Sequence, residues 1–250
     1  MAEPETIVFS HGLLLDHSMF ADQVNHLKNR YRCISYDHRG QGASELATHG
    51  FDIDNITRDA AELIKALEVG PCHFVGLSMG GFVGLRLAIK HPQLVKSLTL
   101  IDTSAEPDGA FKKFQYKLVN FIAKNFGLEI VAGQVVPIMF GKTFYRDPAR
   151  KDELEKWRRI TLNNDPLTIT RAVTGVINRT DIRDQLKRIT CPTLIMVGEE
   201  DVTTPAEKSI TMHRNIKGSK YLVIPRAGHI PTIENPDAVN VAIDGFLGQI

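Results

Sequence analysis

Short runs of apolar residues alternate with helical patterns along most of this chain, and this alternation limits the fold more than any other feature. The runs are rich in Val, Ile, Leu and Phe. A parallel sheet covered by helices produces this pattern, because its strands are buried on both faces. The sequence therefore predicts an α/β fold with a mainly parallel sheet. The predicted strands are Thr6–Ser10, Cys33–Tyr36, Cys72–Leu77, Val95–Ile101, Thr193–Val197 and Tyr221–Ile224.

Helical patterns occupy the segments between the predicted strands. In one of them, Ile56, Ala60 and Ile64 recur on a single face, as in an amphipathic helix. Near the end of the chain, Asn235 followed by Pro236 is typical of a helix start, because the Asn side chain caps the first turn and Pro fits within it. These helices are expected to cover both faces of the sheet.

One long segment interrupts the alternation. From about Glu106 to Arg183 there is no convincing strand pattern, only helical patterns separated by Gly and Pro. We expect a helical cap (residues 106–183) inserted into an α/β core made of residues 1–105 and 184–250. An ordinary set of surface helices is the alternative. The residues that share one helical face in this segment are Phe111, Phe114, Leu118, Phe121 and Ile122.

The composition is that of a compact protein with one core. The chain has 250 residues, 43% of them hydrophobic, and a net charge of +1. This balance offers no field of one sign to nucleic acid or to an anionic membrane surface, and Lys112 and Lys113 are expected on a solvated helix face. With no signal peptide, no membrane-spanning run and only three cysteines, a cytoplasmic location is expected.

A serine between glycines follows the third predicted strand. The segment Gly76–Gly80 (GLSMG) joins Cys72–Leu77 to a helical pattern that begins near Gly81. This spacing suits a sharp strand-to-helix turn that exposes the serine Oγ, with glycines where a Cβ would clash. The first N–H groups of the helix also favour negative charge nearby. Ser78 is therefore the predicted nucleophile.

A serine hydroxyl needs a base that takes its proton. Of the nine histidines, His229 lies in the loop directly after the last predicted strand, from which it can reach the turn that carries Ser78. His213 lies in a helix-like stretch, and His26, like most of the others, lacks such a loop setting. The sequence predicts His229 as the base.

The imidazole in turn needs a carboxylate that fixes its tautomer. Asp201 follows the strand Thr193–Val197 and is expected at the same sheet edge as the nucleophile. Asp102 is a rival because it also follows a strand, and Glu199 and Glu200 are close competitors of which at least one is expected to face solvent. The order serine, aspartate, histidine accompanies this type of nucleophile turn, so Asp201 is preferred.

The tetrahedral intermediate needs N–H donors aimed at its oxygen. The predicted donors are the backbone N–H of Met79, directly after the nucleophile, and that of Leu13, in the loop after the first strand. Gly12 is expected to adopt an unusual backbone angle that turns the Leu13 N–H inward. His11 in the same loop is interpreted as structural rather than as a second base.

The acyl pocket is expected to be apolar, which favours a small, uncharged or modestly hydrophobic substrate. Simple packing is the alternative role for each cap residue. The predicted lining residues are Leu13, Leu14, Met79 and Ile230, with Phe121, Phe140 and Trp157 from the cap.

Several motifs make the chain resemble the α/β-hydrolase superfamily over nearly its whole length. They are Phe9–Gly12 (FSHG), Tyr36–Ser44 (YDHRGQGAS), Gly76–Gly80, Gly198–Asp201 and Ala227–Pro236. The second matches the family's D-x-R-G-x-G-x-S loop, whose Asp37 and Arg39 are usually structural. Within the superfamily, the chain is similar to small carboxylesterases and to the enol-lactonases of the β-ketoadipate pathway.

The resemblance implies a serine hydrolase that cleaves a small, fairly apolar ester or lactone through an acyl-enzyme on Ser78. No metal or organic cofactor is expected, since no Cys/His cluster has ligand spacing and no glycine-rich loop fits a nucleotide phosphate. Ser78 argues against a haloalkane dehalogenase, whose nucleophile is an aspartate. Perhydrolases, carbon–carbon bond hydrolases, acyl-homoserine lactonases and a slow, ligand-sensing signalling protein stay open as alternatives on the same fold.

The chain departs from the family pattern at its start. Relatives usually carry an N-terminal hairpin before the first strand, whereas here Thr6–Ser10 begins close to Met1. If nothing replaces that hairpin, Cys33–Tyr36 becomes an exposed sheet edge, which is a template for pairing with another chain. A homodimer, or a lower stability than that of longer relatives, is therefore expected.

Overall fold

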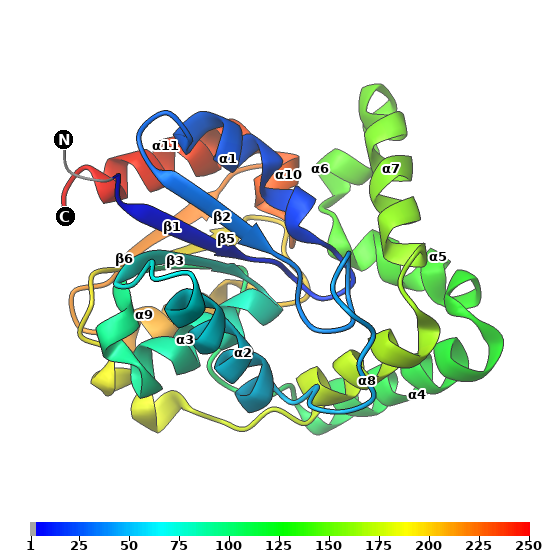
Figure 1. Cartoon of the computed structure of the whole chain (residues 1–250). Coiled ribbons are helices and arrows are strands. Elements are labelled where there is room, and N and C mark those ends of the chain that lie inside the picture. Colours follow the sequence, from blue (N-terminus) through cyan, green and yellow to red (C-terminus); the bar gives the residue numbers. More distant parts are fainter. Residues whose placement is uncertain (1–3) are drawn as a thin grey trace.

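The computed structural model describes residues 4–250, and its strands form one parallel sheet (Figure 1). The strand order is β2-β1-β3-β4-β5-β6, and every neighbouring pair is parallel. Each predicted strand is confirmed, and no end differs by more than one residue. The strands are β1 (Thr6–Ser10), β2 (Arg32–Tyr36), β3 (Cys72–Leu77), β4 (Val95–Ile101), β5 (Thr193–Gly198) and β6 (Lys220–Ile224).

Helices cover both faces of the sheet, as predicted, and each face has its own apolar core. Successive side chains of a strand point to opposite faces, so Ile7 and Phe9 join one core while Val8 joins the other. On the first face lie α1 (Ala21–Leu27) and α11 (Pro236–Leu247), and on the second lie α2 (Ile53–Ala66), α3 (Met79–Lys90) and α9 (Ala206–Asn215) (Figure 1).

The last helix begins where the sequence predicts. The Asn235 side chain accepts a hydrogen bond from the Ala238 N–H at 3.4 Å, and Pro236 occupies the first turn of α11. The shorter helical elements are η1 (His17–Phe20), η2 (Pro92–Leu94), η3 (Pro148–Arg150), η4 (Arg183–Arg188) and α10 (Pro231–Glu234).

A group of helices separates β4 from β5 in the chain, where the sequence predicts a cap. No strand lies between Ile101 and Thr193 in this described part of the chain, and the helices gather beside the carboxyl ends of the strands (Figure 1). Within the group, α4 packs against α5 and α8. The helices are α4 (Ala110–Phe126), α5 (Leu128–Met139), α6 (Lys142–Tyr145), α7 (Lys151–Leu162) and α8 (Pro166–Ile177).

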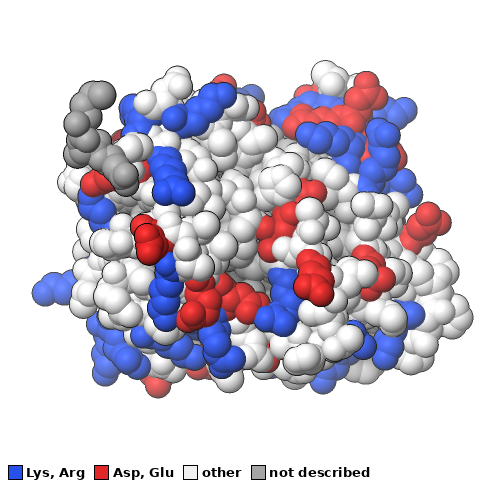
Figure 2. Space-filling model, viewed as in Figure 1, with Lys and Arg blue, Asp and Glu red and all other residues white. Residues whose placement is uncertain are grey.

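Strand β2 forms one edge of the sheet, because it pairs only with β1 among the described residues. Self-association through this edge stays a prediction. Lys and Arg side chains are interspersed with Asp and Glu over the face shown in Figure 2, in keeping with the balanced composition. Within residues 4–250, no helix combines the length and the apolar character that crossing a membrane requires.

Candidate active site

Ser78 lies on a strained turn between β3 and α3. Its backbone has φ 51° and ψ −110°, a conformation that residues with a Cβ rarely adopt. The turn is held from both sides, because the Ser78 N–H donates to the Ile101 carbonyl at 2.9 Å and its own carbonyl accepts from the Thr103 hydroxyl at 2.8 Å. The surrounding bonds therefore maintain a geometry that directs Oγ away from the strand.

The glycines around this turn are required by close contacts, as predicted. A Cβ on Gly76 would lie 2.3 Å from the carbonyl oxygen of Gly80, and a Cβ on Gly80 would lie 1.9 Å from that of Ser10. Both distances are far below van der Waals contact with backbone atoms that cannot move independently. Any other residue at either position would displace the turn or the adjacent strand.

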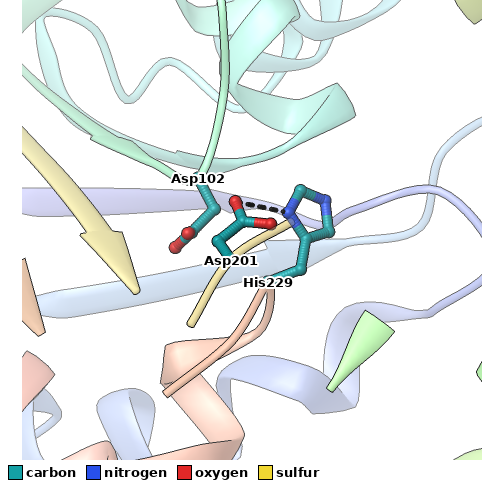
Figure 3. A group of neighbouring side chains, drawn as sticks. All are labelled: Asp102, Asp201 and His229. Carbon is teal, nitrogen blue, oxygen red and sulfur yellow. Dashed lines mark hydrogen bonds and ion pairs between the residues drawn. The ribbon is translucent and has the colours of Figure 1, made fainter. Parts of the chain in front are cut away.

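His229 and Asp201 converge on Ser78 from two loops. His229 Nε2 lies 2.9 Å from Ser78 Oγ, and His229 Nδ1 lies 3.0 Å from Asp201 Oδ2. Figure 3 shows the carboxylate of Asp201 facing the ring of His229. An ionised carboxylate only accepts hydrogen bonds, so Nδ1 must carry the proton and Nε2 is left to accept one from the serine hydroxyl. The structure thus brings the three predicted residues together.

The Asp201 carboxylate is ionised despite its burial. Burial alone would raise its pKa, but the facing His229 and several hydrogen bonds outweigh that effect and lower the pKa below its ordinary value. Among the donors are the Thr203 N–H at 2.7 Å and the Thr204 hydroxyl at 2.7 Å. These bonds fix the orientation of the carboxylate that faces the imidazole.

Asp102, the rival acid in the sequence, lies on the side of Asp201 that faces away from His229 (Figure 3). The carboxylate that bonds to the imidazole is that of Asp201. Burial and the neighbouring Asp201 carboxylate raise the pKa of Asp102 well above its ordinary value. Its Oδ1 accepts from the Gly198 N–H at 2.8 Å, while its buried Oδ2 has no partner among the described residues. A proton on Asp102 resolves this, because the neutral carboxyl can then donate to Asp201.

The competing glutamates have other partners. Glu199 is exposed and accepts from the Arg226 N–H at 3.0 Å, as expected for a solvent-facing residue. Glu200 is half-buried, and its carboxylate accepts from the N–H of Thr143 at 2.8 Å and from the Thr143 hydroxyl. Glu200 therefore connects the loop of Asp201 to the start of α6.

The predicted N–H donors belong to residues that lie beside the space in front of Ser78. Leu13 and Met79 both line the same cavity as Ser78, and neither N–H has an acceptor among the described residues. The expectation for Gly12 was wrong, because the positive φ (70°) belongs to Leu14. Gly12 matters for space instead, since a Cβ there would lie 3.1 Å from a side-chain methyl group of Leu77.

Hydrogen bonds hold the loop that carries Leu13. His11 is fully buried, and its Nε2 accepts from the His38 N–H at 2.9 Å while Nδ1 bonds to the Gly12 carbonyl at 2.7 Å. The Gln41 side chain accepts from the Leu14 N–H at 3.0 Å. His11 thus has the structural role expected of it, and the loop Tyr36–Ser44 contributes through Gln41.

Glu234 is a residue of this site that the sequence analysis missed. Its carboxylate is buried and accepts from the N–H groups of Gly228 at 2.8 Å and Ile230 at 2.9 Å, on either side of His229. It also accepts from the Gly141 N–H at 2.7 Å, just before α6. Burial raises its pKa, although these three donors act in the opposite direction. Its place five residues after the predicted base was the available signal.

A cavity of about 340 Å³ opens in front of Ser78 and His229. Four predicted lining residues border it, namely Leu13, Leu14, Met79 and Ile230. Side chains of α4, α5 and α8 complete an apolar wall that the sequence analysis did not identify. Representative members are Val119, Val131, Val135, Ile169 and Val173.

The three cap aromatics predicted to line the pocket lie elsewhere. Phe121 is 60% exposed and points away from the cavity wall. Phe140 and Trp157 are buried, but in the core cluster beside the cap, where the Phe140 ring stacks on Phe144 with centroids 4.9 Å apart. These predictions were wrong, and packing, the alternative role, applies to Phe140 and Trp157.

The main cation in the cavity wall is already neutralised. The Arg179 guanidinium is only 3% exposed and lies 3.0 Å from the Asp108 carboxylate. It also donates to the Glu106 carbonyl at 3.1 Å and lies over the Phe82 ring, one helical turn after Ser78. The cavity therefore presents no unpaired positive charge from Arg179 to a ligand.

Asp102, Asp201 and His229 together offer donor atoms within 4.8 Å of one another, a spacing that a metal ion can bridge. Their hydrogen bonds argue for another role. His229 directs one ring nitrogen at Asp201 and the other at Ser78, and both oxygens of Asp201 accept hydrogen bonds. The arrangement is suited to moving a proton from a hydroxyl to an imidazole.

Comparison with known proteins agrees with the geometry. Residues 5–236 match the family model described as alpha/beta hydrolase fold. The chain is 29% identical to 3-oxoadipate enol-lactonase 1 of Acinetobacter baylyi over 98% of this chain and 89% of that protein. Among solved structures, it resembles a thermophilic esterase from Thermogutta terrifontis with a TM-score of 0.92 and 31% identity, over 100% of this chain and 91% of that one. The enol-lactonase from Burkholderia xenovorans has a TM-score of 0.92 and 27% identity, over 99% and 92% of the two chains. The chain therefore belongs to the α/β-hydrolase family.

Proposed function

We propose that this member of a hydrolase family cleaves carboxylic esters or lactones through an acyl-enzyme on Ser78. The observation that carries the proposal is the continuous contact from Ser78 Oγ to His229 at 2.9 Å and from His229 to Asp201 at 3.0 Å. A hydroxyl whose hydrogen bond is accepted by an imidazole, itself held by a carboxylate, is an activated nucleophile.

In the proposed reaction, Ser78 Oγ attacks the substrate carbonyl carbon while His229 Nε2 accepts the hydroxyl proton. The N–H groups of Leu13 and Met79 stabilise the negative charge that forms on the carbonyl oxygen. The negative charge of Asp201 stabilises the imidazolium of His229. His229 then gives its proton to the leaving alcohol oxygen. In the second half, His229 takes a proton from water, the hydroxide attacks the acyl carbon, and Ser78 leaves with the proton.

The cavity supports a small, mostly apolar and uncharged substrate. Its volume of about 340 Å³ suits a small molecule, and its wall consists mainly of aliphatic side chains. A substrate carboxylate would lose its hydration there without gaining a free cation, since Arg179 is paired with Asp108. Neutral esters and lactones of moderate chain length are therefore the proposed substrate class.

The decisive experiment compares wild type with Ser78→Ala on p-nitrophenyl butyrate. The proposal expects many turnovers per molecule for wild type and a loss of about 10³-fold or more for the variant. Ser35→Ala is the matched control, because the buried Ser35 hydroxyl lies on β2 and has no hydrogen-bond partner among the described residues. It should keep wild-type activity.

Three further results would contradict or change the proposal. Mass spectrometry after reaction with a p-nitrophenyl phosphonate should place one covalent adduct on Ser78, and an adduct elsewhere contradicts the assigned nucleophile. A single slow burst without turnover, together with ligand-dependent stabilisation, would instead favour the ligand-sensing protein. Formation of peracids from hydrogen peroxide, or cleavage of a carbon–carbon bond, with esters inert, would favour a perhydrolase or a carbon–carbon bond hydrolase instead.

A further inference from the structure

Helix α4 carries a row of large apolar side chains on its outer surface. Phe111, Phe114, Leu118 and Phe121, which we call the phenylalanine stripe, are 75%, 64%, 51% and 60% exposed. Their spacing of three, four and three residues places them on one face of the helix. In most helices of globular proteins such a face packs on a core, whereas here no described residue covers it. A cluster of this size is unusual for a surface that only contacts water.

A row of lysines runs beside the phenylalanine stripe. Lys113, Lys117 and Lys124 are spaced by four and seven residues, so they share the neighbouring face of α4, and the helix contains no acidic residue. Of the acidic residues that flank α4, Asp108 is paired with Arg179, and Glu129 lies in the first turn of α5. The net charge of +1 conceals this local excess. In Figure 2 the lower right of the molecule, where α4 and α5 lie in Figure 1, is mostly uncharged, with Lys and Arg along its lower border and Asp and Glu above it.

We propose that the outer face of α4 binds a lipid surface that carries anionic headgroups. Exposed Phe and Leu side chains can enter the boundary between headgroups and acyl chains, and adjacent lysines can contact the anionic groups, which is how interfacial amphipathic helices bind. The charge balance of the whole chain had predicted no membrane partner. The distribution of charge on α4 leads to the opposite conclusion.

A second copy of the chain fits this face less well. In a two-fold dimer that buries the phenylalanine stripe, the lysine rows of the two copies would lie close together and repel each other. An anionic surface neutralises the lysines instead, with a gain of about fivefold in affinity for each lysine near the surface. Three lysines therefore correspond to roughly 10²-fold tighter binding to anionic than to neutral lipid.

The inner face of the same helix borders the substrate cavity. Tyr116, Val119 and Ala123 of α4 line the space in front of Ser78. A lipid surface bound to the outer face would thus lie within one helix diameter of an apolar cavity. Apolar esters concentrate in lipid, so this position would favour their entry. The docking itself does not depend on the proposed esterase activity, because none of the stripe residues lines the cavity.

The test is co-sedimentation of the full chain with lipid vesicles at low salt. Wild type should bind vesicles of phosphatidylglycerol and phosphatidylcholine, and should bind pure phosphatidylcholine roughly 10²-fold more weakly. Phe114→Ser with Phe121→Ser should reduce binding to both vesicles at least about tenfold. Lys113→Glu with Lys117→Glu should remove the preference for the anionic vesicles. Ser78→Ala should bind like wild type, which separates this proposal from the catalytic one.

Matched controls lie far from α4. Val241→Ser removes an apolar side chain that is 71% exposed on α11, and Lys217→Glu reverses an exposed charge near the end of α9. Both should bind vesicles like wild type, and all variants should keep the wild-type melting temperature. No binding to anionic vesicles, or undiminished binding by the phenylalanine variant, overturns the proposal. A dimer in solution that becomes a monomer in that variant overturns it in favour of a second copy.

Discussion

The two buried aspartates near His229 respond differently to the same substitution. Asp201→Asn removes the negative charge that faces Nδ1 and can place an amide N–H against a ring nitrogen that must itself donate. Asp102→Asn replaces a carboxyl whose pKa is raised well above its ordinary value by burial and by the Asp201 charge, which favours its neutral form. The new amide can still accept from Gly198 and donate to Asp201, so little should change.

The expected loss follows from the geometry. An imidazolium charge and a carboxylate charge 3.0 Å apart attract each other by about 5.5 kcal/mol at the effective dielectric constant of about 20 that suits protein sites. That attraction is present only when His229 has taken the serine proton, so it lowers the barrier rather than the ground state. At about 1.4 kcal/mol for each factor of ten, Asp201→Asn should lower kcat/KM about 10⁴-fold. Asp102→Asn should lower it less than about tenfold.

The assay is kcat/KM for p-nitrophenyl butyrate at neutral pH, with thermal unfolding of each variant as the control for folding. A folded Asp201→Asn protein with nearly full activity would refute the reasoning. So would an Asp102→Asn protein that loses as much activity as Asp201→Asn, because Asp102 would then carry the essential charge. Asp102→Leu, which can neither accept nor donate, should be less stable than Asp102→Asn.

Three further predictions concern the surroundings of the site. Glu234→Gln should lower the free energy of unfolding by about 2 kcal/mol, because an amide has one acceptor oxygen for N–H groups that now use two carboxylate oxygens. It should also lower kcat more than it changes KM. Equal effects on kcat and KM would contradict a role of Glu234 in positioning the His229 loop. Burial and the nearby His11 lower the pKa of His38 well below its ordinary value, so below about pH 6.5 the unfolded chain binds a proton that the folded chain does not. The contribution of His38 to the free energy of unfolding is therefore fully present above that pH and is lost as the pH falls, by up to about 1.4 kcal/mol per pH unit. In urea unfolding at a series of pH values, His38→Gln should make the free energy of unfolding depend less on pH. Asp108→Asn should leave Arg179 without a charged partner, so that it can attract a substrate carboxylate. The ratio of kcat/KM for p-nitrophenyl hexanoate to kcat/KM for the mono-p-nitrophenyl ester of adipic acid should therefore fall by about tenfold. An unchanged ratio would show that the Arg179–Asp108 pair does not select against charged substrates.

The fold was predictable from the sequence because its strands are buried on both faces. Central strands such as Cys72–Leu77 lack the alternation of polar and apolar residues that marks a strand with one exposed face. Turn residues mark the ends of these strands. The meeting of Ser78, Asp201 and His229 was predictable for the same reason. Each residue follows a parallel strand, and the carboxyl ends of parallel strands lie at one edge of the sheet.

The cavity wall was not predictable in the same way, because helical periodicity identifies an apolar face without showing what it contacts. Phe121 lies on the most apolar face of α4, yet that face is exposed, and the cavity is lined by the less apolar face with Val119. Which side of a cap helix faces the core depends on its packing against α5 and α8. That packing is a tertiary property without a local sequence pattern.

Two buried or half-buried carboxylates connect one part of the cap to the loops that carry the proposed acid and base. Glu234 bonds to Gly141 as well as to the His229 loop, and Glu200, next to Asp201, bonds to Thr143. Both contacts meet the short segment before and within α6, so this segment cannot shift without disturbing the orientation of imidazole or carboxylate. Helix α4 has its own connection to the Asp201 loop, because Lys112 Nζ donates to the Thr203 carbonyl at 2.6 Å and the Thr203 N–H donates to Asp201 at 2.7 Å. The exposed side chains of the phenylalanine stripe make no such bond and do not line the cavity, so their substitution should weaken lipid binding while Ser78, His229 and Asp201 keep their geometry. Lipid binding and catalysis should therefore be separable by mutation.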